Sequence, residues 1–187
     1  MRPKNDNSHI GAKIRIRKEA LKAARNATVL DCFAGKGLMW SNFRLEKYHG
    51  YEIKGSENPD IEQGDNLKIL PLTDLSEWAL IDLDSWGEPT RQMEAIARNP
   101  TLRDGTVIVY TFIFGTFGRQ SRSFFQDLEG AEVFQSHPSL SCRVADYLFE
   151  MKIRRMFGAR KLVEIRKNDT LVKRYGFFIV DKKNKNV

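Results

Sequence analysis

The stretch VLDCFAGKGLMW, residues 29–40, decides the fold that the sequence predicts. It begins with an apolar run typical of a buried parallel strand, and Asp31 lies near the end of that run. Gly35 and Gly37 follow, and glycine can adopt positive φ and leaves no Cβ to block a close ligand. This order predicts a tight turn pressed against a nucleotide-like cofactor. A plain turn without a ligand is the alternative that two glycines alone leave open.

Two common phosphate-binding patterns do not fit this loop. Position 40 is Trp where the dinucleotide pattern GxGxxG has its third glycine. Lys36 lies between the two glycines, and no GK[ST] sequence follows it as a P-loop requires. The loop therefore favours a cofactor other than a nicotinamide dinucleotide or a nucleoside triphosphate.

The rest of the chain alternates between strand and helix patterns. We expect strands at residues 27–33, 48–53, 61–63, 77–84 and 106–114, and a hairpin at 160–183. We expect helices at residues 14–25, between the glycines and about residue 46, at 89–99 and at 143–157. This alternation predicts an α/β fold: a Rossmann-like, doubly wound, mostly parallel seven-stranded sheet that ends in an antiparallel hairpin. The chain reads as one domain, with a basic N-terminal extension at 1–26, a core at 27–183 and a basic tail at 184–187.

Acidic and amide side chains follow the predicted strands. Glu52 ends the second strand, Asp65 and Asn66 follow the third, and Asp84 follows the fourth. Ligands on wound parallel sheets bind outside the carboxyl ends of the strands. A carboxylate at the position of Glu52 can accept hydrogen bonds from both hydroxyls of a ribose. These residues predict a nucleoside-binding edge.

Four segments together resemble the class I S-adenosylmethionine-dependent methyltransferases: VLDCFAGKG, YEIKG, QGDNLKIL and ALIDLDSWGEP. The resemblance covers about residues 27–114 and implies S-adenosylmethionine as the cofactor. It assigns the cofactor-binding positions to Asp31, Phe33, Gly35, Gly37, Glu52, Asp65 and Asn66.

The segment after the fourth strand indicates the reaction. ALIDLDSWGEP resembles the corresponding segment of tRNA guanine-N2 dimethyltransferases and, more loosely, the [DN]PP[YFW] motif of amino-group nucleic-acid methyltransferases, although Ser85 replaces a proline. The Asp84 carboxylate and the Ser85 carbonyl could accept the two N–H groups of an exocyclic amine and aim its lone pair at the methyl donor. Trp86 could stack on an extruded base.

Charge is segregated along the chain. The net charge is +7, with +6 in residues 1–26, +9 in residues 151–187 and −8 between them. Two basic ends around an acidic centre suggest contact with a polyanion. We expect nucleic acid as the partner, with RNA favoured over DNA. The candidate phosphate contacts are Lys13, Arg15 and Arg17, with the pair Arg154 and Arg155. Arg119 and Arg122, in the long segment after residue 115, are expected to form part of the acceptor site.

Other functional classes receive little support. No apolar run approaches a membrane span, no secretory signal pattern is seen, and two cysteines favour a reducing, cytoplasmic compartment. Three widely separated histidines predict no metal site. Two alternatives stay open: methyl transfer to a protein or small molecule, and a non-catalytic nucleic-acid-binding module. Oligomeric state is left open.

Overall fold

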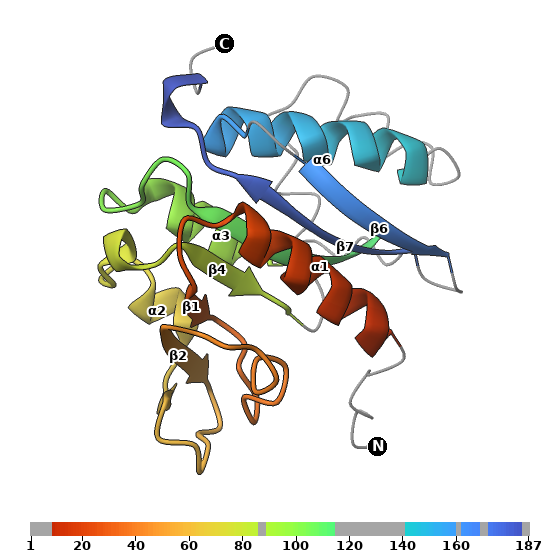
Figure 1. Ribbon diagram of the computed structural model, residues 1–187. Coiled ribbons are helices and arrows are strands. Elements are labelled where there is room, and N and C mark those ends of the chain that lie inside the picture. The colour runs from red at the N-terminus through yellow and green to blue at the C-terminus, as the bar shows by residue number, and fades with distance from the viewer. Residues whose placement is uncertain (1–8, 86–88, 115–140, 160–161, 169–171, 185–187) are drawn as a thin grey trace.

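A computed structural model describes residues 9–85, 89–114, 141–159, 162–168 and 172–184. Its centre is a seven-stranded sheet with the order β3-β2-β1-β4-β5-β7-β6. The strands are β1 (Thr28–Asp31), β2 (Lys47–Glu52), β3 (Ile61–Gln63), β4 (Leu80–Leu83), β5 (Val107–Phe114), β6 (Leu162–Asn168) and β7 (Val172–Ile179). Strands β1 to β5 pair in parallel, and β7 is antiparallel to both β5 and β6. The predicted wound sheet with a closing antiparallel hairpin is confirmed (Figure 1).

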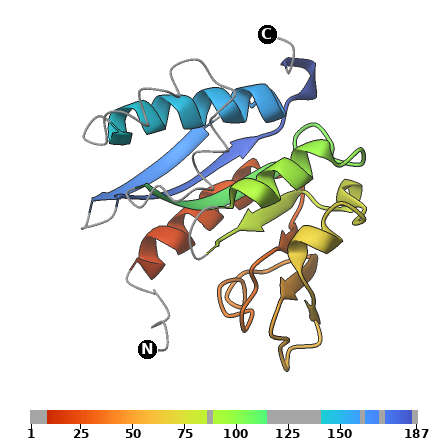
Figure 2. The same ribbon diagram turned by 180° about the vertical axis from the view of Figure 1, so that it is seen from behind.

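Helices cover both faces of the sheet (Figures 1 and 2). They are α1 (Ile10–Ala23), α2 (Asn66–Ile69), α3 (Thr90–Arg98) and α6 (Ser141–Phe157), with short 3₁₀ turns η1 (Leu75–Glu77) and η2 (Lys182–Asn184). One apolar core packs α1 against β5 and β7, and a second packs α3 and α6 against the opposite face. The two cores are the physical reason for the continuous apolar runs of the central strands, because such strands are buried on both faces.

Helix α1 buries a face that matches the sequence pattern only in part. The pattern points to Ile14, Ala20, Leu21 and Ala24 as the apolar side; Ala20 is buried, whereas the other three are half-buried. Ile16, Ala20 and the charged Arg17 are the buried residues of the helix. An arginine on the buried face requires acidic partners in the sheet, because an unpaired buried charge is strongly unfavourable.

The predicted helix between the glycines and residue 46 is wrong, since residues 32–46 form a succession of turns. Trp40 lies at the centre of this segment, 2% exposed, and its indole Nε1 donates to Asp82 Oδ2 at 2.8 Å. The Ser41 hydroxyl bonds to the carbonyl of Leu38, one of the local contacts through which serine competes with helix formation. The anchored indole packs in the same apolar core as α1, so the turns cover this face of the sheet without forming a helix.

Gly50 allows the loop after β1 to lie close against β2. The Ala34 N–H donates to the carbonyl of Tyr51 at 3.1 Å. A Cβ built on Gly50 would come within 2.5 Å of Ala34 Cβ and 3.1 Å of Ile61 Cγ1. Such contacts could be relieved only by a shift of the loop or of β3.

We expect Gly50→Ala to lower the free energy of unfolding by about 1–3 kcal/mol, the usual cost of overpacking. Chemical denaturation followed by circular dichroism measures this change. Gly11→Ala is the matched control, because a Cβ there meets nothing within 4 Å, and stability should be unchanged or higher. Equal stability of Gly50→Ala and the wild type would contradict the close approach.

Candidate active site

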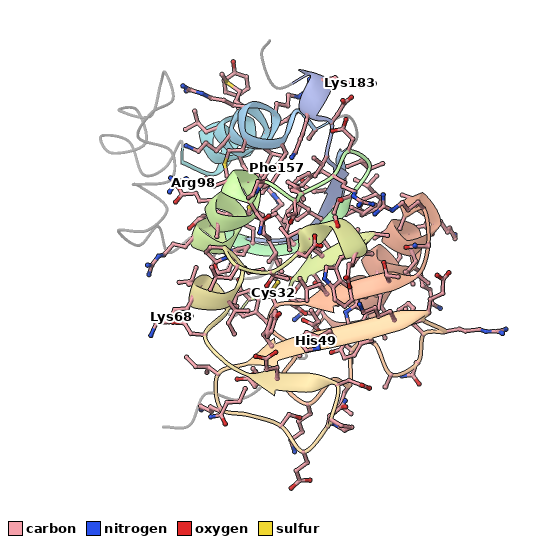
Figure 3. All side chains as sticks on the ribbon, turned by 90° about the vertical axis from the view of Figure 1, so that its left-hand side faces the viewer. Cys32, His49, Lys68, Arg98, Phe157 and Lys183 are labelled. Atoms are coloured by element: carbon pink, nitrogen blue, oxygen red, sulfur yellow. The ribbon has the colours of Figure 1, made fainter. Side chains whose placement is uncertain are left out.

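A pocket of about 220 Å³ opens at the carboxyl ends of the first three strands. Its lining residues follow β1, end β2, follow β3 or belong to α3: Cys32, Phe33, Tyr51, Glu52, Ile53, Gly64, Asp65, Asn66, Leu67 and Gln92. Figure 3 shows Cys32, the first residue after β1, near the middle of the molecule. Four of the predicted cofactor residues, Phe33, Glu52, Asp65 and Asn66, therefore lie together in one pocket.

Glu52 joins the glycine loop to the end of β2. Its Oε2 accepts from the backbone N–H of Gly35 at 3.1 Å, and its Oε1 accepts from Lys54 N at 3.3 Å. Each carboxylate oxygen can accept a further hydrogen bond. Glu52 thus has the chemistry and the location that binding of ribose hydroxyls requires.

The far wall of the pocket is formed by the residues after β3. Asp65 Oδ1 accepts from Leu67 N at 3.0 Å and caps the short helix α2. The Asn66 amide donates to the carbonyl of Cys32 and accepts from Gln92 Nε2 at 3.0 Å. Asn66 therefore ties the end of β1 to α3. Gln92 was missed in the sequence, where it is an ordinary polar residue of a predicted helix.

The two predicted glycines have different surroundings. Gly35 has φ +56°, and a Cβ built there meets nothing within 4 Å, so space remains beside it. Gly37 has φ +74°, and its Cβ would lie 2.8 Å from Asn58 Nδ2. Gly37 is thus required for packing of the loop, and neither glycine is among the residues that line the pocket.

Asp31 lies beneath the loop. It is 2% exposed; Oδ1 accepts from Phe33 N at 3.0 Å, and Oδ2 accepts from the Tyr48 hydroxyl at 3.3 Å. The predicted direct contact with the cofactor is therefore corrected, because this side chain has almost no surface for a ligand. Asp31 instead supports the loop from below.

Asp84 lies directly after β4 and is held by donors on two elements. Its Oδ1 accepts from Lys13 Nζ at 2.8 Å and from the Thr111 hydroxyl at 2.7 Å. Its Oδ2 accepts from Arg17 at 3.0 Å. Arg17 also donates through Nε to Asp82 Oδ2 at 2.7 Å, and its side chain is 2% exposed.

The prediction that Arg17 and Lys13 contact phosphate is corrected by these contacts. Arg17 is buried between two carboxylates, so its guanidinium is not on the surface. Lys13 is only 14% exposed, and its ammonium is paired with Asp84. Both cations neutralise the chain's own acids.

The buried acids have different charge states. The register places Asp31 beside Asp82 on neighbouring strands. Burial, reinforced by Asp82, raises the pKa of Asp31 to about 8. Burial also raises the pKa of Asp82, despite its contact with Arg17. Burial opposes ionisation of Asp84 as well, but Arg17 and Lys13 lower its pKa below the usual value. The proton of this cluster is therefore favoured on Asp31, whereas the Asp84 carboxylate is ionised.

The remaining predicted site residues are placed as follows. Ser85 is 8% exposed, and its hydroxyl has no hydrogen-bond partner in the described part of the chain. Arg15 is exposed on α1, and Arg154 is exposed on α6, where it pairs with Glu150. Trp86, Arg119 and Arg122 lie outside the described residues.

Within the described ranges, no group of three or more His, Cys, Asp or Glu residues is arranged to hold a metal ion. None of the helices in that part of the chain has the length and apolar character to cross a membrane.

Solved structures with a similar fold include methyltransferases. A SAM-dependent methyltransferase from Archaeoglobus fulgidus is 11% identical, with a TM-score of 0.49 over 89% of this chain and 92% of that chain. A possible exported protein from Bordetella parapertussis is 11% identical, with a TM-score of 0.50 over 92% of this chain and 67% of that chain. The N-methyltransferase NodS from Bradyrhizobium japonicum WM9 is 10% identical, with a TM-score of 0.46 over 95% of this chain and 99% of that chain.

The chain has a Rossmann-like α/β fold with a mostly parallel seven-stranded sheet. At 10–11% identity, these likenesses concern the fold alone. No protein-family model and no curated protein matches the sequence.

We expect the proton on Asp31 to make stability depend on pH. Its pKa is about 8 in the folded chain and near 3.8 when unfolded, so between these values the folded state binds more protons. Its contribution to stability is therefore lost as pH rises from about 4 to 8. Asp31→Asn, which is neutral at every pH, should gain roughly 1–2 kcal/mol or more over the wild type between pH 5 and pH 8.

Urea denaturation at several pH values measures this difference. The exposed Asp60→Asn is the control, and its stability should follow that of the wild type. Parallel pH profiles for Asp31→Asn and the wild type would show that Asp31 holds no proton in the folded chain.

Proposed function

We propose that this chain is an S-adenosylmethionine-dependent methyltransferase that modifies an amino nitrogen of a nucleic-acid base, with RNA favoured over DNA as the acceptor. The observation that carries the proposal is the pocket at the ends of β1 to β3, in which Glu52 and Asp65 face one cavity. A typical small-molecule site is roughly 300–1,000 Å³, so a cavity of about 220 Å³ suits only part of the cofactor, its nucleoside end. When bound, this cofactor supplies an electrophilic methyl group.

The pocket residues fit that nucleoside. Glu52 would accept the ribose hydroxyls, and Asp65 would accept from the adenine amine. Ile53 and Leu67 supply apolar surface for the base. The open space beside Gly35 leaves room for the methionine end.

Asp84, at the same edge of the sheet, would accept a hydrogen bond from the acceptor amine. An exocyclic amine is a weak nucleophile because its lone pair is delocalised into the ring. Hydrogen bonds from its N–H groups to Asp84 and to the Ser85 carbonyl would favour the pyramidal form and direct the lone pair. Such orientation is a large part of what an enzyme can contribute to a bimolecular transfer.

Nucleic acid is proposed as the acceptor because of the basic ends of the chain. Lys13 and Arg17 are paired internally. The exposed cations that support this choice are Arg15 on α1 and Arg154 and Arg155 on α6. Arg119 and Arg122 would add to these cations, and Trp86 would stack on the acceptor base. The closer likeness to tRNA guanine-N2 dimethyltransferases and a cytoplasmic location belong to the same hypothesis.

Methyl transfer to a protein or small molecule is the second candidate. The internal pairing of Lys13 and Arg17 favours it, because two of the predicted phosphate contacts are lost. Steep salt dependence of RNA binding would favour nucleic acid over this candidate.

We expect Glu52→Ala to weaken cofactor binding by roughly tenfold or more, which is about 1.4 kcal/mol. Isothermal titration calorimetry with S-adenosylmethionine measures the affinity. Glu52→Gln, which keeps one acceptor oxygen, should bind with intermediate affinity, and the exposed Glu57→Ala should bind as the wild type does. Wild-type affinity of Glu52→Ala would remove Glu52 from the cofactor site.

Incubation of the protein with methyl-labelled cofactor and total RNA, DNA or protein fractions tests the proposed reaction. We expect label in RNA. Asp84→Asn should reduce transfer by roughly hundredfold or more, in the range of a lost proton-accepting partner, with cofactor affinity nearly unchanged. Label only in protein would support the second candidate, and the absence of label from every fraction despite cofactor binding would support a non-catalytic module.

A further inference from the structure

Asp84 has a nearly complete set of hydrogen bonds before any substrate arrives. A carboxylate has about four acceptor positions, two on each oxygen. Lys13 and Thr111 occupy both positions of Oδ1, and Arg17 occupies one of Oδ2. One acceptor position, on Oδ2, is left for a substrate N–H.

The two cations that hold Asp84 come from one helix and are linked to each other. Arg17 donates through Nη1 to the carbonyl of Lys13 at 3.1 Å, so the positions of both donors are coupled. Ile16 and Ala20 anchor α1 to the sheet, and Arg17 binds Asp82 within β4. The helix therefore presents both cations to Asp84 from a fixed position.

Lys13 differs from Arg17 in what it does for the fold. Arg17 neutralises Asp82 as well as Asp84, and its loss would leave buried acids without a counterion. Lys13 lies at the edge of the cluster, 14% exposed, and its ammonium is paired with Asp84. The ion pair of Lys13 thus serves mainly to fix the orientation and charge of one carboxylate.

We propose that Lys13 and Arg17 are positioning residues for methyl transfer, which hold the Asp84 carboxylate ionised and leave one oxygen position for the acceptor amine. The inference rests on the proposed function. It assigns to α1 a role at the reacting edge of the sheet in place of the phosphate contact predicted from sequence.

Lys13→Met tests the proposal, because it keeps the length of the side chain and removes the charge. Without Lys13, the pKa of Asp84 should rise, and the acid limb of the pH dependence of kcat should move to higher pH by roughly one unit. In this acidic range kcat should fall by about tenfold, with recovery at higher pH and with an unchanged Kd for S-adenosylmethionine. Lys13→Arg should restore the wild-type profile.

Lys18→Met is the matched control, since Lys18 is an exposed cation of the same helix. It should leave the profile, kcat and Kd unchanged. If Lys13→Met lowers kcat equally at every pH, or not at all, the proposal is overturned. If the wild type binds cofactor but labels no acceptor, the proposed function has failed instead, and this outcome is seen before any variant is made.

Discussion

The ion pair between Arg17 and Asp82 is the interaction on which the rest of the structure depends. It joins α1 to the centre of the sheet in a region where both side chains are excluded from water. A broken buried pair costs about 3–5 kcal/mol, because the remaining charge has no solvent to stabilise it. The pair thus fixes one rotation of α1 over β5 and β7, because a shift that brought the neighbouring Ile16 to this position would bury an apolar side chain against a carboxylate.

The same cluster shapes the pocket on the other side of β1. Asp31 takes part in the charge balance through Asp82, and it also accepts the backbone N–H of Phe33, which lines the pocket. Trp40 completes the cluster by donating to Asp82 and fixes the far end of the same loop. The glycine loop is therefore held at both ends by buried carboxylates, and it needs no helix after it to keep its shape.

Much of the fold could be predicted because the strands are short apolar runs with clear ends. The third strand, residues 61–63, coincides with β3, and the first four strand ends carry the residues that form the pocket and the acid cluster. The absence of a helix at residues 38–46 could not be predicted from the sequence. The inward position of Trp40 depends on a hydrogen bond to Asp82, which is forty-two residues away. The pairing of Lys13 and Arg17 escaped prediction for the same reason: a basic helix has the same local pattern whether its cations face solvent or buried acids.

The internal pairing of Lys13 and Arg17 weakens the inference from basic composition to a nucleic-acid partner. A cation paired with a buried carboxylate adds little to attraction for a polyanion, so the charge of the N-terminal region overstates its surface potential. The C-terminal third repeats this pattern, because Arg174 is 3% exposed and lies 3.9 Å from Glu164. The surface charge of the described chain therefore comes from exposed cations such as Arg15 on α1 and Lys182 and Lys183 after β7, and it cannot be read from the total charge of either end.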